Sequence, residues 1–71
     1  MKTYVVTVEL QGYSGRYKEI IYVGQDEYKA FNTNVSKYDS GIELEVWENE
    51  KRKSQYHWNF RTNKWKLVAG W

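Results

Sequence analysis

Few side chains in this sequence could take part in acid–base chemistry, and the best candidates fall on two neighbouring predicted strands. Glu43 and Glu45 alternate along residues 42–48, and His57, the only histidine, alternates with aromatic residues along 55–60. If these segments pair, either carboxylate could face the imidazole and orient it for proton transfer. A lone pair on an open sheet lacks the nucleophile, pocket and oxyanion donors of an active site. We therefore expect no enzymatic activity.

Metal, redox and cofactor sites have no sequence signature. The chain contains no cysteine and a single histidine, which excludes disulfides, thiolate zinc sites and cysteine nucleophiles. No glycine-rich phosphate loop or metal-ligand spacing is present. We expect no cofactor.

Charge is distributed unevenly along the chain. All nine acidic residues lie before residue 51, whereas residues 51–71 carry six basic residues and no acidic one. Such asymmetry produces a field that steers partners. A phosphate-contacting rim on two turns would use Lys51, Arg52, Lys53, Arg61 and Lys64. Nearby glutamates would repel a phosphate backbone, and lysines at hairpin tips also protect strand edges. Nucleic-acid binding is therefore the alternative hypothesis.

Trp47 is the most suggestive single residue, because it interrupts an otherwise polar strand face. Large exposed aromatic side chains are enriched at the centres of protein interfaces. The competing interpretation is that Trp47 lies over lysine stems or caps the sheet edge. The predicted protein-binding surface comprises Trp47, Glu43, Glu45, His57 and Lys66.

These residues must be positioned by strands whose patterns are clear at the N-terminal end. Residues 3–10 alternate, with Tyr4, Val6, Val8 and Leu10 on one face. Residues 11–15 are typical of a turn, and 16–23 of the returning strand of a hairpin. Residues 20–23 are apolar on both faces, which favours a central place in the sheet or cover by a helix.

The segment 26–38 has the pattern of an amphipathic helix. Asp26 is a good N-cap, and one apolar stripe is formed by Tyr28, Phe31, Val35 and Tyr38. Asp39-Ser40-Gly41 is a plausible stop, with Gly41 in the left-handed cap position. The interior residues 32–34 are poor helix formers, so a short helix is the alternative.

The last three predicted strands form an antiparallel meander. Ile42, Leu44 and Val46 share the core face, and residues 49–53 form a charged loop. With the bend at 62–63, the predicted register pairs Phe60 with Trp65, Trp58 with Leu67 and Tyr56 with Ala69. Trp71 has the same parity as these core residues.

Residues 1–71 are predicted to form one α+β domain. Its elements follow the order ββαβββ, a twisted antiparallel five-stranded sheet with one helix on its apolar face. A small SH3-like or OB-like barrel is the alternative if 26–38 is less helical. No segment has the length of a membrane span or the pattern of a secretory signal, so we expect a soluble, cytoplasmic protein.

The composition and the candidate residues favour a non-enzymatic module that binds another protein. A regulator or inhibitor of a larger protein, including a phage-type counter-defence factor, belongs to this class. Homodimerisation is compatible with it, because a second copy would enlarge a small core. The alternative remains a nucleic-acid-binding protein that uses the basic turns.

Overall fold

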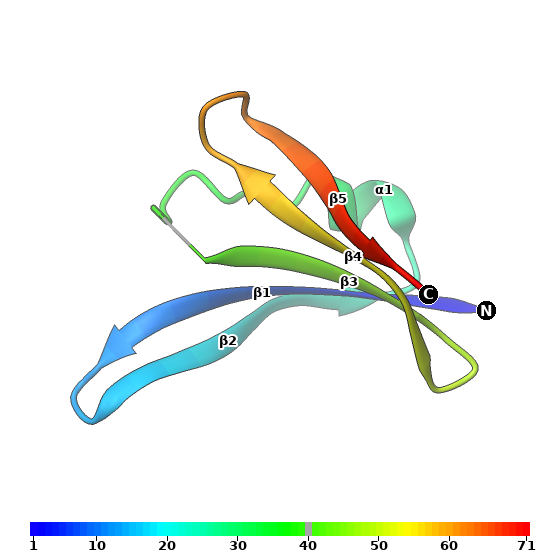
Figure 1. Cartoon of the computed structure of the whole chain (residues 1–71), viewed down its shortest axis with the longest axis horizontal. Coiled ribbons are helices and arrows are strands. Elements are labelled where there is room, and N and C mark those ends of the chain that lie inside the picture. Colours follow the sequence, from blue (N-terminus) through cyan, green and yellow to red (C-terminus); the bar gives the residue numbers. More distant parts are fainter. Residues whose placement is uncertain (40) are drawn as a thin grey trace.

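The part of the chain that the structure describes forms five β-strands and one short helix (Figure 1). The computed structural model describes residues 1–39 and 41–71. The elements are β1 (Lys2–Gly12), β2 (Gly15–Gly24), α1 (Glu27–Phe31), β3 (Ile42–Glu48), β4 (Lys51–Asn59) and β5 (Lys64–Gly70). The strands lie in the order β2-β1-β3-β4-β5, and every neighbouring pair is antiparallel. The predicted α+β class and ββαβββ order are confirmed.

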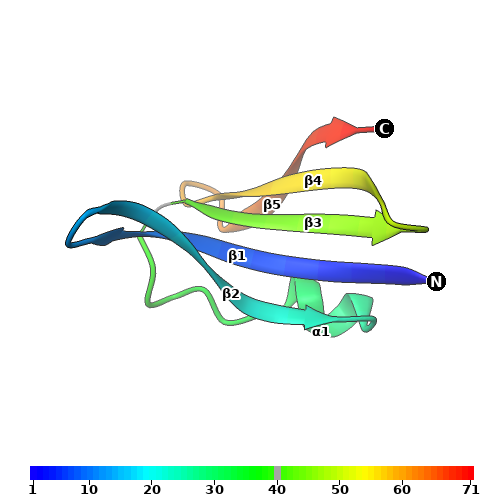
Figure 2. The same ribbon diagram turned by 90° about the horizontal axis from the view of Figure 1, so that it is seen from below.

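The core lies between the sheet and the helical segment. Alternate residues of the two central strands are fully or almost fully buried, namely Tyr4, Val6, Val8, Ile42, Leu44 and Val46. Ala30 of α1 and Val35 of the following segment complete the buried set. Figure 2 shows α1 and this segment on one side of the sheet. We call this side the inner face and the opposite side the outer face.

The strand β2 lies at the edge of the sheet, so the first of the two predicted alternatives, a central position, is wrong, whereas α1 contacts this strand as the second alternative expects. Its apolar residues are divided between the two faces by a bulge at Ile21, where Thr7 pairs with Ile20 but Val6 pairs with Tyr22. Ile21 and Tyr22 pack against the core, whereas Ile20 and Val23 are more than half exposed.

The helix is shorter than the apolar stripe predicted. Asp26 is the N-cap, and its Oδ1 accepts a hydrogen bond from Lys29 N at 3.0 Å, as predicted for this residue. The helix ends at Phe31 because the next two polar side chains bond to its carbonyl groups. Asn32 Nδ2 donates to Tyr28 O at 2.8 Å, and Thr33 Oγ1 donates to Ala30 O at 2.9 Å.

Because the helix ends at Phe31, only part of the predicted apolar stripe faces the core. Val35 is buried and Tyr38 packs against the core, but Tyr28 is 77% exposed, so its predicted core position is wrong. Gly41 has a left-handed φ of 69°, but it precedes β3 instead of capping the helix. Ser40, the middle residue of the predicted stop, lies outside the described residues.

Phe31 joins the end of the helix to the strands beneath it. Its ring makes edge contacts with those of Tyr4, Tyr56 and Trp65 at centroid distances of 6.3, 5.1 and 6.2 Å. Trp65 Nε1 donates to Phe31 O at 3.0 Å. An aromatic cluster therefore ties the end of the helix to β1 and to the last two strands.

Tyr4 is the buried polar anchor of the same cluster. Its hydroxyl donates a hydrogen bond to Glu27 Oε2 at 3.1 Å. Burial, and then the hydrogen bond and charge of this carboxylate, raise the pKa of Tyr4 above its usual value. The neutral phenol is thus the form that the fold stabilises.

A two-residue turn joins β3 to β4. Asn49 and Glu50 both have positive φ, 54° and 64°, which is typical of a type I′ turn. The strand β4 begins directly after it at Lys51, so the predicted loop over residues 49–53 is too long. Glu50 holds a conformation that is unfavourable for a residue with a Cβ.

The register between β4 and β5 differs from the prediction by two residues. Trp58 faces Trp65 and Tyr56 faces Leu67, whereas Phe60 lies in the turn. The turn is longer than predicted because Asn59 Oδ1 accepts hydrogen bonds from the amides of Arg61 and Thr62. A shift of two residues preserves the faces of Trp58 and Tyr56, but it removes Phe60 from the core.

Candidate functional site

The predicted site residues of the outer face are brought together by strand pairing. Glu43 lies opposite His57, and His57 lies opposite Lys66, so these three form a row across β3, β4 and β5. The predicted pairing of a glutamate with His57 is therefore confirmed for Glu43. Glu45 instead lies opposite Gln55.

The Glu43 carboxylate bonds to neighbours other than the imidazole. Lys18 Nζ lies 3.4 Å from its Oε1, and Gln55 Nε2 donates to its Oε2. The imidazole is exposed and has no hydrogen-bond partner among the described residues. The row thus places a partly exposed carboxylate, an exposed imidazole and an exposed ammonium group side by side, which offers complementary contacts to a second surface.

Trp47 lies on the outer face, as its parity predicted, and is only partly exposed. Its Nε1 donates to Glu45 Oε1 at 3.3 Å. A bulge after Val46 places Arg52 opposite Trp47, and Arg52 Nη1 donates to Glu45 Oε2 at 2.8 Å. The carboxylate of Glu45 therefore holds both side chains.

Trp71 extends this group at the end of the chain. The guanidinium carbon of Arg52 lies 4.5 Å from the centre of the Trp71 ring, and Trp71 N donates to Lys53 O at 2.8 Å. The ring remains 63% exposed. We name Glu45, Trp47, Arg52 and Trp71 the Trp47 cluster.

Alternation alone assigned Trp71 to the core face, and this prediction is wrong. A bulge in β5 pairs Tyr56 with Leu67 but Gln55 with Ala69, so Val68 is an extra residue. The inserted residue reverses the faces of the last residues, and the Trp71 ring lies against Arg52 of the outer face. No pattern in the sequence marks this bulge.

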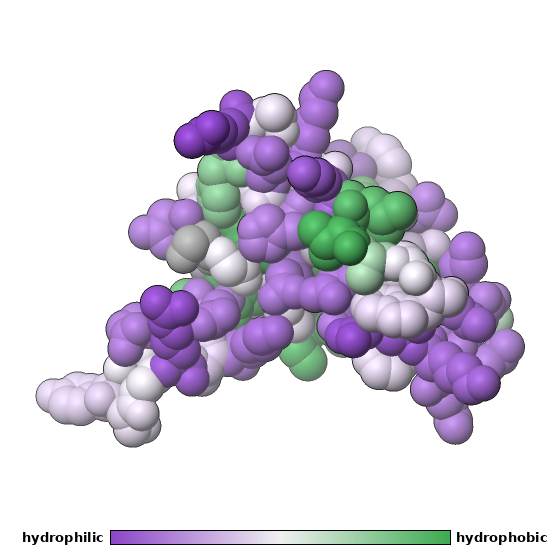
Figure 3. Space-filling view, in the orientation of Figure 1, coloured by the Kyte–Doolittle hydropathy of each residue, from purple (hydrophilic) through white to green (hydrophobic). Residues whose placement is uncertain are grey.

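Apolar side chains continue from the Trp47 cluster along β5. Val68 lies beside His57 and Lys66 of the outer face and is 54% exposed, whereas Leu67, which pairs with Tyr56, lies on the inner face. In Figure 3, hydrophobic side chains gather over β5 and are surrounded by hydrophilic ones. This arrangement of an apolar centre and a polar rim is typical of protein interfaces.

The five basic residues proposed for phosphate binding are divided between the two ends of β4. Lys51, Arg52 and Lys53 begin this strand, whereas Arg61 and Lys64 flank the turn beyond its other end. At about 3.3 Å per residue, the two groups lie roughly 25 Å apart. Arg52 is also held by Glu45 and Trp71. These residues do not form one continuous rim.

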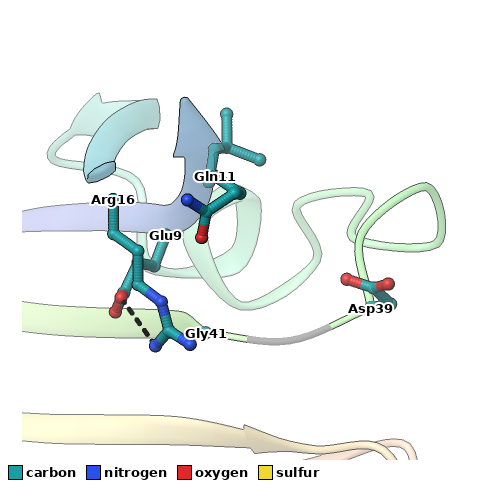
Figure 4. Close-up of a pocket in the computed structure, with 6 residues that line it drawn as sticks. Glu9, Gln11, Arg16, Asp39 and Gly41 are labelled. Atoms are coloured by element: carbon teal, nitrogen blue, oxygen red, sulfur yellow. Dashed lines mark hydrogen bonds and ion pairs between the residues drawn. The ribbon is translucent and has the colours of Figure 1, made fainter. Parts of the chain in front are cut away.

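A hollow of about 300 Å³ lies at the far end of the sheet, between β1, β2 and the segment before β3. Figure 4 shows Arg16 directed toward Glu9, with an Nη1–Oε1 distance of 3.3 Å, and Asp39 on the opposite side. The ion pair satisfies the charge of Glu9 and is exposed to solvent. These residues contain no further feature that indicates a ligand.

Comparison with known protein families, with curated proteins and with solved structures finds no match. Among the residues that the structure describes, no helix has the length and apolar character needed to cross a membrane.

Proposed function

We propose that this protein is a non-enzymatic binding module whose outer sheet face docks another protein. The observation that carries the proposal is the Trp47 cluster, in which one carboxylate and one guanidinium hold two tryptophan side chains. Tryptophan and arginine are the residue types that most often dominate the binding energy of protein interfaces.

Order within the cluster supports this role. Side chains that are already held in one geometry lose less conformational entropy on association. Trp47 and Arg52 are each fixed by Glu45, and Trp71 is fixed by its backbone hydrogen bond and the Arg52 contact. The aromatic surface is therefore preorganised for binding a partner.

The flanking residues suggest the chemistry of the partner. The row Glu43–His57–Lys66 and the neighbouring Lys18 present both signs of charge beside the exposed Val68 of β5. A complementary surface would carry an apolar centre and charges of both signs at its rim. Such an interface depends only mildly on salt, in contrast to one that neutralises many phosphates.

The test is affinity capture with the tagged protein in its native host, followed by measurement of affinity for the captured protein with purified variants. Trp47→Ala is expected to weaken binding at least tenfold, because truncation of a hot-spot tryptophan costs about 2 kcal/mol or more. Glu45→Lys is expected to weaken binding as well, since it releases Trp47 and repels Arg52.

Tyr13→Ala is the matched control, because Tyr13 is a fully exposed aromatic residue at the distant β1–β2 turn. It should bind the partner like the wild-type protein. If Trp47→Ala and Glu45→Lys both retain full affinity while remaining folded by circular dichroism, the proposed surface is wrong.

A further inference from the structure

A second hollow, of about 460 Å³, lies between the segment after α1 and the turn that joins β4 to β5. Its lining combines aromatic side chains, among them Trp58 and Phe60, with amide and hydroxyl side chains, among them Asn32, Asn34 and Ser36. None of these side chains carries a charge. The volume falls in the range of about 300–1,000 Å³ that small-molecule sites occupy. The part of a ligand that enters it is expected to be uncharged, because the lining offers no opposite charge.

The wall on the strand side provides aromatic surface. Phe60, which the turn removes from the core, is 40% exposed, and Trp58 is partly exposed. Trp58 is held by an edge contact with Trp65 at a centroid distance of 5.2 Å. Partly exposed aromatic side chains of this kind can stack on a planar ring.

The opposite wall provides amide groups with defined orientations. Asn34 Oδ1 accepts hydrogen bonds from Ser36 N and Ser36 Oγ at 3.0 and 2.7 Å. The oxygen is therefore occupied, and Asn34 Nδ2 remains as a donor. Asn32 Nδ2 donates to Tyr28 O, which leaves Asn32 Oδ1 as an acceptor. The rim therefore offers both a donor and an acceptor.

Cationic residues lie in or directly after the turn that borders this hollow, and Arg61 lines an adjoining hollow that shares Trp58 and Phe60 with it. Arg61 follows Phe60 in the turn, and Lys64 follows Asn63. Neither forms an ion pair within the described part of the chain, and residues 51–71 contain no acid that could neutralise them. An anionic group attached to the ligand would be attracted to this turn.

We propose that this hollow binds a nucleobase, with the attached phosphate at Arg61 and Lys64. A base is planar and uncharged, and its edge carries donors and acceptors, which matches the aromatic wall and the two asparagines. The adjacent cations favour a nucleotide over a neutral sugar. The site is separate from the Trp47 cluster, which lies on the outer face near the other end of β4.

The experiment measures binding of adenosine, adenosine monophosphate and a short fluorescein-labelled single-stranded oligodeoxynucleotide at low salt. Phe60→Ala should weaken all three by about tenfold, which is the effect expected for loss of one stacking platform. Asn34→Asp keeps the acceptor for Ser36 but removes the donor, so it should also weaken all three. Arg61→Gln should weaken the monophosphate and the oligonucleotide but not adenosine.

Tyr13→Ala and Trp47→Ala are the controls, and both should bind like the wild-type protein. A gain in affinity from monophosphate to oligonucleotide identifies single-stranded nucleic acid as the ligand, whereas equal affinities identify the free nucleotide. Absence of binding at about millimolar ligand, or wild-type affinity in folded Phe60→Ala and Asn34→Asp, would overturn the proposal. Loss of the captured protein partner in Phe60→Ala, without nucleotide binding, would assign the hollow to protein docking and also overturn it.

Discussion

The guanidinium of Arg52 lies 4.5 Å above the ring of Trp71 while it donates a hydrogen bond to Glu45 at 2.8 Å. One side chain thus connects β3, the first residues of β4 and the residue that follows β5. Alternation alone would have placed Glu45 on the outer face and Trp71 on the core face, yet Arg52 contacts both. It also explains why an exposed terminal tryptophan has a defined position.

Replacement of Arg52 separates the shape of this contact from its charge. Arg52→Lys keeps the positive charge but loses the planar group that covers the Trp71 ring. We expect the free energy of unfolding in urea to fall by less than about 1 kcal/mol, because the contact is partly exposed. Affinity for the protein partner should fall severalfold. Lys51→Arg, at the neighbouring exposed position, should change neither quantity.

The turn between β3 and β4 contains a correctable source of strain. Glu50 has a φ of 64°, a conformation that costs a residue with a Cβ about 1 kcal/mol relative to glycine. Glu50→Gly should therefore raise the free energy of unfolding by about that amount, and it creates the asparagine–glycine pair that type I′ turns favour. Glu50→Ala removes the same carboxylate but keeps the Cβ, so it should not stabilise the protein. Equal stabilisation by both variants would attribute the gain to charge.

Two leucines on the inner side of the sheet differ in burial and provide a matched pair. Leu44 is fully buried in β3, whereas Leu67 of β5 is 55% exposed. Leu44→Ala should cost about 2–5 kcal/mol, which is a large part of the stability of so small a domain. Leu67→Ala should cost much less, about 1 kcal/mol or under. Thermal unfolding followed by circular dichroism measures both, and equal losses would contradict the position of the core.

Tyr4 predicts a specific response to alkaline pH. Because its pKa is raised in the folded protein, the unfolded chain loses this proton first, and stability falls as the pH rises above about 10. Below that pH the contribution is fully present. Tyr4→Phe should have a shallower fall in stability over this range, measured by urea unfolding at several pH values. Tyr13→Phe removes a phenol that is fully exposed, so it should follow the wild-type curve.

The faces of the central strands were predictable because burial there is one-sided. In β1 and β3, each residue of the alternating apolar set is covered by α1 and its following segment. A shift by one residue would expose Val6 and Leu44 together, so the pattern specifies their faces strongly. The position of Trp47 on the outer face followed from the same alternation.

The length of the helix and the registers of the outer strands were not predictable in this way. The helix ends where Asn32 and Thr33 bond to backbone carbonyl groups, a competition that an apolar stripe does not reveal. Bulges at Ile21 and Val68 change the faces of the residues that follow them. Asn59 sets the long turn through its side chain, which moves Phe60 into the neutral hollow.

Both outermost strands contain an inserted residue, Ile21 in β2 and Val68 in β5. Each insertion bends the outermost backbone and interrupts its regular row of unpaired amide and carbonyl groups. The edge strands therefore offer other molecules of this protein no long, flat strand with which to pair. The same irregularities that defeat simple alternation thus oppose amyloid-like polymerisation of a chain rich in aromatic and β-branched residues.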